Sequence, residues 1–371
     1  MGLFFLLLFA ACQSAVVVSS TPTSPTSQIV TQTVKSSPVP AESFTPSPTL
    51  TAEQALYPYT MAGLRKHSYQ SGEIHIRSTL NETDKYTVYL IEYPSDGLTI
   101  TGVMQIPKGD GPFPVIIMNH GFFSRSVYHS GDGTDRSSAF LAGYGYITLA
   151  SDYRSWGDSD VGVSLFYSGL AIDVINLIAA IPTIPQADPS RVGIWGHSMG
   201  GGVTMKVLTV LGAMRIKPTI KAAALYSPVS ADFADIIARW GNGCLGDIAK
   251  GEQIVGCNSS DVVPLDLPNE LLIAYRSAGS DLETLRQFSP INYLDSVDVP
   301  LQIHYGSEDG KTLAGTPSKW PVDLTQALRD QGKQVELYEY KGEGHSFIGQ
   351  PWFDFMIRVL NFFDDHVKNA S

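Results

Sequence analysis

Residues 196–200 read Gly-His-Ser-Met-Gly, between an apolar run that ends at Trp195 and a helical pattern from Gly200 to Leu211. A Gly-x-Ser-x-Gly sequence between a buried strand and a helix is typical of a sharp strained turn that lifts the serine above the sheet. The helix that follows points its free N–H groups toward developing negative charge. This stretch therefore predicts a strand–turn–helix unit with Ser198 as a nucleophile.

The segments around this turn predict a mostly parallel sheet covered by helices on both faces, the α/β class of fold. Continuous apolar runs are typical of strands buried on both faces. They occur at 114–119 and 145–152, and a third buried strand is expected within 188–195. Further strands are expected at 222–226, 301–305 and 335–340, and helices at 171–181, 322–330 and 352–366. Alternating segments at 73–77, 86–92 and 98–106 predict antiparallel strands before them.

One long segment interrupts the alternation of strands and helices. Residues 228–290 show no clear strand and contain both Cys244 and Cys257. An insertion after a strand's carboxyl end lies over the ligand crevice of an open α/β sheet. We therefore expect this segment to form a lid. Its stretch Val262–Pro268 is apolar except for one acid, while Arg239 and Arg276 could be recruited to bind a peptide terminus.

A serine hydroxyl needs a general base, and a nucleophile on such a turn is followed along the chain by an acid and then a histidine. His345 lies in the glycine-rich turn Gly342–Ser346, just beyond the last expected strand. Asp309 follows the strand that ends at Tyr305, and Glu308 is the nearest alternative. We predict a catalytic triad of Ser198, Asp309 and His345.

The oxyanion hole of such a site is built from two backbone N–H groups. The sequence predicts Met199, next to the nucleophile, and Phe122, in the loop after Asn119, as the donors. His120 and His197 are interpreted as packing residues, and Tyr153 and Trp156 could either line the pocket or pack. The residues Gly131–Asp135 only faintly resemble a calcium loop, so we expect a polar turn there and no metal site or cofactor.

Several segments together resemble bacterial α/β-hydrolases related to the catalytic domain of the prolyl oligopeptidase family. They are Val115–Gly121, Asp152–Asp158, Asp188–Arg191, Gly196–Gly201, Ser289–Asp295 and Gly342–His345. The resemblance covers most of the chain from about Tyr57 and implies the α/β-hydrolase fold, with the same three triad roles. Two departures stand out: we expect no β-propeller, and the acid loop is long, through Lys311–Lys319.

The first residues predict a targeting segment. Residues 1–11 form a short apolar run that suits a signal peptide, and Ala10-Ala-Cys12 is similar to a bacterial lipobox with Cys12 as the lipidated residue. The alternative is an ordinary cleaved secretory signal. Residues 12–51, rich in Ser, Thr and Pro, predict a disordered tether or a propeptide before a hydrolase domain at 52–371. We thus expect an extracytoplasmic protein, anchored to a bacterial membrane or secreted.

Outside the cytoplasm, Cys244 and Cys257 are expected to form a disulfide, whereas in a reducing cytosol they would be two unrelated thiols. Charged residues make up 16% of the chain and the net charge is −11. Nucleic-acid binding depends on cations that neutralise phosphates, so we exclude it.

Three functions remain, and the sequence does not fix the oligomeric state. The leading hypothesis is a carboxylic ester hydrolase that acts through an acyl-enzyme on a small-molecule ester. A serine-type peptidase acting on short peptides is the first alternative. A surface binding lipoprotein that has lost catalysis is the second, and the intact order of serine, acid and histidine argues against it.

Overall fold

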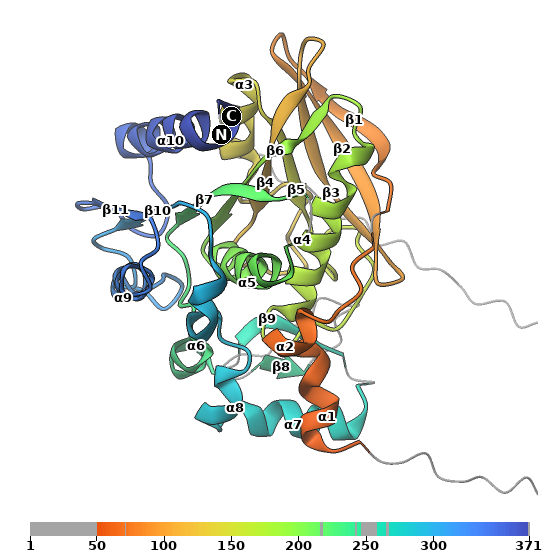
Figure 1. The fold of residues 1–371 in the computed structure, drawn as a ribbon, viewed down its shortest axis with the longest axis vertical. Helices are drawn as coiled ribbons and strands as arrows, with labels where there is room; N and C mark the ends of the chain where they lie inside the picture. The colour runs from red at the N-terminus through yellow and green to blue at the C-terminus, as the bar shows by residue number, and fades with distance from the viewer. Residues whose placement is uncertain are drawn as a thin grey trace, which may run out of the picture. The chain divides into compact units, whose positions relative to one another are not determined.

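The computed structural model describes residues 50–70, 72–215, 218–241, 243–245, 258–264 and 267–369. Its centre is a nine-stranded sheet with the order β1-β2-β3-β5-β4-β6-β7-β10-β11 (Figure 1). The strands are β1 (His75–Glu82), β2 (Tyr86–Ser95), β3 (Leu98–Pro107), β4 (Phe113–Asn119), β5 (Ile147–Ser151), β6 (Ala187–His197), β7 (Ile220–Tyr226), β10 (Leu301–Gly306) and β11 (Val335–Tyr340).

The sheet is mostly parallel, as the sequence predicted. The pairs from β5 through β4, β6, β7 and β10 to β11 are all parallel. The pairs β1–β2, β2–β3 and β3–β5 are antiparallel, which confirms the hairpin-like character of the first strands. Because parallel strands share one carboxyl edge, the loops after β4, β6, β7, β10 and β11 gather there, where ligands of open α/β sheets bind.

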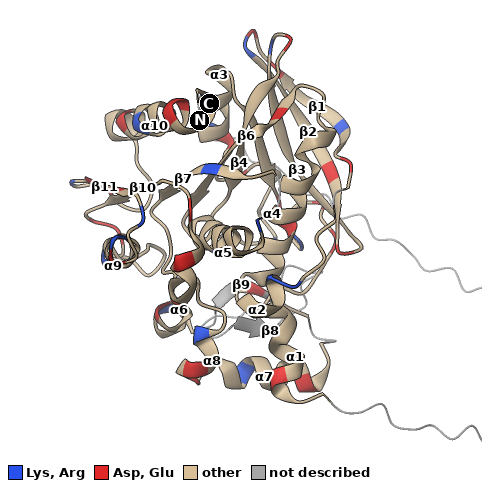
Figure 2. Cartoon of the chain, viewed as in Figure 1, with Lys and Arg blue, Asp and Glu red and all other residues tan. Residues whose placement is uncertain are grey.

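Helices cover both faces of the sheet (Figure 1). On one face, α3 (Asp135–Gly143) and α10 (Gly349–Phe363) pack with Trp195 and Tyr226 in one apolar cluster. On the other face, α4 (Ser168–Ala180), α5 (Met199–Met214) and α9 (Lys319–Asp330) share a second cluster. Alternation along β6 explains the division, because Ile194 belongs to the second cluster and Trp195 to the first. Figure 2 shows that Asp and Glu intersperse with Lys and Arg on helices such as α10.

The inserted segment 228–290 is more structured than the sequence predicted. It contains the helices α6 (Phe233–Trp240), α7 (Asn269–Ala278) and α8 (Leu282–Arg286). It also contains a parallel pair of short strands, β8 (Gly243–Leu245) and β9 (Asn258–Val263), so the expectation that it has no strand was wrong. These strands are short and lack a long alternating pattern, which hides them from a search for periodicity. The first helices, α1 (Ala52–Leu56) and α2 (Met61–Leu64), precede the sheet, and α1 packs on α7.

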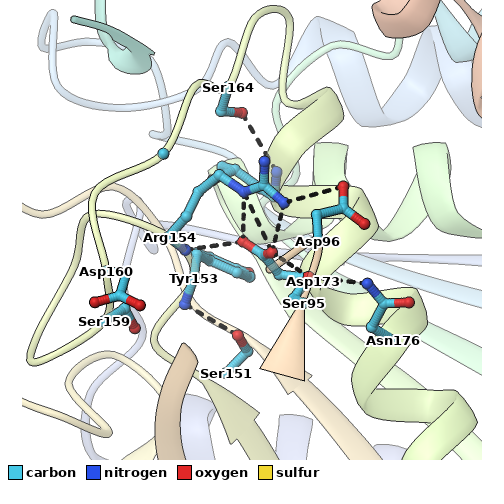
Figure 3. A network of polar contacts seen from close by, with 12 residues as sticks. Ser95, Asp96, Ser151, Tyr153, Arg154, Ser159, Asp160, Ser164, Asp173 and Asn176 are labelled. Carbon is cyan, nitrogen blue, oxygen red and sulfur yellow. Dashed lines mark hydrogen bonds and ion pairs between the residues drawn. The ribbon is translucent and has the colours of Figure 1, made fainter. Parts of the chain in front are cut away.

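A buried ion pair fixes the loop that follows β5. The Arg154 side chain reaches Asp173 of α4, with Nη2 2.7 Å from Oδ1, and both side chains are almost fully buried (Figure 3). The backbone N–H of Arg154 donates to the same carboxylate at 2.8 Å, and Ser95 Oγ donates to it at 2.7 Å. Because every acceptor position of Asp173 is used, the charge is compensated in the interior. The motif Asp152–Asp158 thus has a structural use in this chain.

Several predictions concern residues outside the described part. The proposed signal peptide 1–11, nearly all of the tether 12–51, Cys12 and Cys257 lie there, so the lipid anchor and the disulfide stay predictions. Cys244 lies in β8. Within the described residues, no helix combines the length and apolar character needed to cross a membrane.

Candidate active site

Ser198 lies on the strained turn that the sequence predicted. Its backbone has φ 56° and ψ −121°, a conformation that non-glycine residues rarely adopt. The turn needs its glycines, since a Cβ at Gly196 would lie 2.4 Å from the Gly200 carbonyl oxygen and a Cβ at Gly200 would lie 2.1 Å from the Asn119 carbonyl oxygen. The tight crossing of β6, α5 and the end of β4 therefore holds Ser198 at the carboxyl edge of the sheet.

His345 and Asp309 form a hydrogen-bonded pair at the same edge. His345 Nδ1 lies 2.9 Å from Asp309 Oδ2, and the Thr316 hydroxyl donates to that oxygen at 2.8 Å. Burial acts to raise the pKa of Asp309, but the hydrogen bond and charge of His345, together with the hydroxyl groups of Thr316 and Ser227, outweigh it and lower this pKa. Asp309 is thus an ionised acceptor that fixes His345 Nδ1–H. Glu308 instead pairs with Lys311 at the surface.

A close backbone approach brings the loops of these two residues together. Gly306 ends β10, and a Cβ there would lie 2.2 Å from the Glu343 carbonyl oxygen, in the turn before His345. The N–H of Glu308 donates to the same carbonyl at 2.9 Å. The long acid loop between Asp309 and α9 is also held from the inserted segment. Arg239 of α6 donates to the carbonyls of Gly310, Thr312 and Gly315, at 3.1, 2.6 and 2.9 Å from Nη2.

The residues predicted for the oxyanion hole lie beside Ser198. Met199 opens α5, and the first N–H groups of a helix have no intrahelical acceptor. Gly121 lies against the nucleophile, since a Cβ there would be 3.1 Å from Ser198 Cβ. Phe122 follows it and lines the same cavity as Ser198 and Met199. The loop after β4 thus brings the Phe122 backbone next to the turn, as an oxyanion donor requires.

His197 contacts the loop of His345, which the sequence interpretation missed. Its ring stacks on Tyr226 at a centroid distance of 4.4 Å, and its Nε2 lies 3.1 Å from the His345 carbonyl oxygen. Burial, aided by the charge of His345, lowers the pKa of His197 to about 3. His197 is therefore neutral at ordinary pH and its Nε2–H donates to that carbonyl. The position next to the nucleophile was the available signal, although the partner lies 148 residues away.

Ser198, Met199, His345 and Phe122 all open onto one cavity of about 760 Å³. Aromatic side chains dominate its wall: Phe122, Phe123, Tyr167, Trp195, Tyr226, Trp240, Phe347 and Trp352. The inserted segment contributes Trp240 and Ser260, and the acid loop contributes Leu313 and Ala314. A mostly apolar cavity with few polar groups is typical of a small-molecule site.

The remaining candidate residues have other surroundings. Tyr153 and Trp156 are fully buried in the core, which answers the question that the sequence left open. His120 stacks between Tyr128 and Tyr153 and contacts the Asp152 carbonyl at 3.2 Å, so it packs as expected. Among the described residues, no three His, Cys, Asp or Glu side chains are grouped to hold a metal ion.

The fold and the site together define a hydrolase class. Residues 115–355 match the model of the alpha/beta hydrolase family, and the chain belongs to this family of enzymes. It is 30% identical over 133 residues to the esterase FrsA of Shigella boydii, a match that covers 36% of this chain and 30% of that relative. The chain therefore matches less than a third of the length of this curated relative.

Solved structures share the fold at low identity. The acetyl xylan esterase from Paenibacillus sp. R4 is 17% identical with a TM-score of 0.56, over 86% of this chain and 96% of that chain. The acylaminoacyl peptidase of Pyrococcus horikoshii is 18% identical with a TM-score of 0.52, over 82% of this chain and 52% of that chain. The prediction that the chain is an α/β-hydrolase is confirmed, and the solved structures that share its fold include both esterases and peptidases.

Proposed function

We propose that this enzyme is a carboxylic ester hydrolase in which Ser198, His345 and Asp309 form the catalytic triad. The observation that carries the proposal is the cavity. Its wall holds the strained Ser198, the His345 that is paired with Asp309, and both predicted oxyanion donors. These groups are the parts that acyl transfer to a serine requires.

The reaction follows from the positions of these groups. Ser198 Oγ attacks the ester carbonyl while His345 Nε2 accepts the hydroxyl proton, and the N–H groups of Met199 and Phe122 stabilise the oxyanion. The imidazolium then donates that proton to the departing alkoxide, which leaves as the alcohol. Water, deprotonated by His345, attacks the acyl-enzyme; the acyl–Oγ bond breaks, the imidazolium returns its proton to Ser198 Oγ, and the carboxylic acid is released. Asp309 stays ionised and stabilises the imidazolium, in keeping with its lowered pKa.

The cavity favours an ester over a peptide. Among the described residues that line it there is no Asp or Glu, so this part of the wall presents no carboxylate to the α-ammonium group of a peptide. Arg239, which the sequence offered for a peptide terminus, is committed to three backbone carbonyls of the acid loop. An amine leaving group must also be protonated as the bond breaks, which demands close positioning of the peptide. The aromatic wall suits an apolar acyl or aryl group.

The test compares leaving groups on purified protein. We expect kcat/KM for a short p-nitrophenyl ester to exceed that for matched aminoacyl and dipeptidyl p-nitroanilides by at least about 100-fold, or about 2.7 kcal/mol. The Ser198→Ala variant is the control that measures any hydrolysis not carried out by the proposed nucleophile. An anilide hydrolysed as fast as the ester would make the enzyme a peptidase. Inertness toward both would leave the binding-protein alternative.

A further inference from the structure

One wall of the cavity carries an arginine that has no role in the proposed triad. Arg136, in the first turn of α3, lines the cavity together with Trp352 of α10. The central carbon of its guanidinium group lies 3.5 Å from the centroid of the Trp352 ring, a close cation–π contact. The two residues come from helices that cover the same face of the sheet (Figure 1).

The charge of Arg136 is not neutralised within the described part of the chain. Arg136 makes no ion pair there, whereas Arg154, Arg191 and Arg286 each pair with a carboxylate. It is the only Lys or Arg among the cavity's described lining residues, and no Asp or Glu is among them. Arg136 is exposed, so its guanidinium group is open to a bound anion.

The contact with Trp352 leaves the useful part of the guanidinium group available. An arginine stacked on an aromatic face uses that face, while its N–H groups lie in the guanidinium plane. Those N–H groups match the two oxygens of a carboxylate in a bidentate arrangement. The indole therefore fixes the cation without using its hydrogen-bond donors.

A hydroxyl lies next to Arg136 on this wall. Ser137, its neighbour in the sequence, lines the cavity as well. Trp195 of β6 also lines the cavity, but it is 1% exposed and its indole N–H is buried, so that donor does not reach a bound molecule. Among the described lining residues, Arg136 is therefore the charged donor for an anionic substrate.

We propose that Arg136, held against Trp352, forms an anion subsite, and that the preferred substrate is an ester that also carries an ionised carboxylate. One cation neutralises one carboxylate, whereas a phosphate monoester would bring up to two charges to a wall whose described residues include a single arginine. This proposal rests on the ester hydrolase function and extends it to a substrate class. Arg136 is a specificity residue, because its bond to the anion also stabilises the transition state of ester cleavage.

The test uses pairs of esters that differ only in charge. One pair places the charge on the acyl side, p-nitrophenyl hemiglutarate against p-nitrophenyl pentanoate. The other places it on the alcohol side, the butanoate of 4-hydroxybenzoate against that of 4-hydroxybenzamide. We expect kcat/KM to favour the anionic member of at least one pair by roughly 10- to 100-fold, the size of a charged hydrogen bond. The butanoate of 4-hydroxyphenyl phosphate distinguishes carboxylate from phosphate, and preference for it would overturn the carboxylate assignment.

Variants separate charge from shape. Arg136→Gln should reduce the preference to near unity, and Arg136→Glu should reverse it toward an ester that carries an ammonium group. Arg329→Gln, on the exposed end of α9, is the matched control and should keep the wild-type ratio. A ratio near unity for both pairs in the wild-type enzyme, or an unchanged ratio in Arg136→Gln, would overturn the subsite.

Binding measurements distinguish this failure from failure of the ester hydrolase proposal. The Ser198→Ala protein is titrated with glutarate and 4-hydroxybenzoate, and with 4-hydroxybenzamide as the neutral control, while tryptophan fluorescence is recorded. Trp352, which stacks on Arg136, should report occupancy directly. If the esters are inert but the carboxylates bind and Arg136→Gln abolishes binding, the subsite stands while the ester hydrolase function fails. Equal affinity for 4-hydroxybenzoate and 4-hydroxybenzamide would overturn the subsite but not the ester hydrolase proposal.

Discussion

His197 Nε2 lies 3.1 Å from the carbonyl oxygen of His345, so the residue before the nucleophile holds the loop of the proposed general base. His197 and Ser198 are neighbours on the end of β6, and His345 follows β11. This hydrogen bond, here called the bridge, therefore fixes the position of the base relative to the nucleophile. Because burial keeps His197 neutral, the bridge should not change with pH in the working range.

Replacing Ser198 tests the nucleophile. Ser198→Ala should lower kcat by about five or more orders of magnitude, as removal of the nucleophile of a triad does. It should also abolish labelling by a fluorophosphonate probe, measured by intact mass. Ser277→Ala, on the exposed face of α7, is the control and should label like the wild type. Labelling of the Ser198→Ala protein at the wild-type level would contradict the assignment.

Replacing His197 tests the bridge to His345. His197→Phe keeps a ring against Tyr226 but removes the N–H donor, so kcat should fall roughly 5- to 15-fold, about 1–1.5 kcal/mol for one hydrogen bond. His197 also lines the cavity, but the phenyl ring fills the same place, so KM should change little. His197→Gln, which retains an N–H donor, should recover part of the loss. A rise in KM at constant kcat would show that His197 acts on substrate binding instead.

The buried His304 should make stability depend on pH. Burial, with the charge of Arg358, lowers its pKa well below the usual value, and its ring nitrogens lie 2.8 Å from Gln302 Oε1 and 3.1 Å from the Tyr340 hydroxyl. The unfolded chain therefore takes up the proton first, near pH 6.5. The stabilisation is complete above that pH and is lost as the pH falls toward the pKa of the folded state, by about 1.4 kcal/mol per unit.

Denaturation of wild type and His304→Gln at several pH values measures this effect. The variant lacks the titrating group, so the difference in free energy of unfolding should be constant above pH 7 and shift in favour of the variant as the pH falls to 5. Comparing the two proteins removes the contributions of Asp152 and Asp261, whose pKa burial raises and which act with the opposite sign. A difference that stays flat over the whole range would contradict the prediction.

The predicted disulfide can be tested by mass spectrometry on the purified protein. We predict a bond between Cys244 and Cys257, which would contribute roughly 3 kcal/mol in the chain-entropy model for a loop of about 14 residues. After alkylation without reductant, intact-mass analysis should find neither cysteine alkylated. After reduction, the same analysis should find both alkylated. Two alkylated thiols in the unreduced protein would end this prediction.

Local patterns predicted most of the sheet, because the central parallel strands β4 and β5 are short apolar runs bounded by turn residues. The sequence placed Ser198, Asp309 and His345 at strand ends, and the structure pairs the last two. What it missed depends on contacts between distant segments. His197 with His345, and Arg136 with Trp352, meet only after the chain has folded. No periodicity or spacing in a single sequence encodes such pairs.

The contact of Arg239 with the acid loop is made to backbone carbonyls alone. A guanidinium group that binds the main chain does not depend on the side chains along it. Residues such as Leu313 and Ala314, which face the cavity, can therefore vary during evolution while the loop stays attached and Asp309 stays in place. The enzyme can in this way acquire new substrates by substitutions beside its acid, at little risk to the proton-transfer machinery.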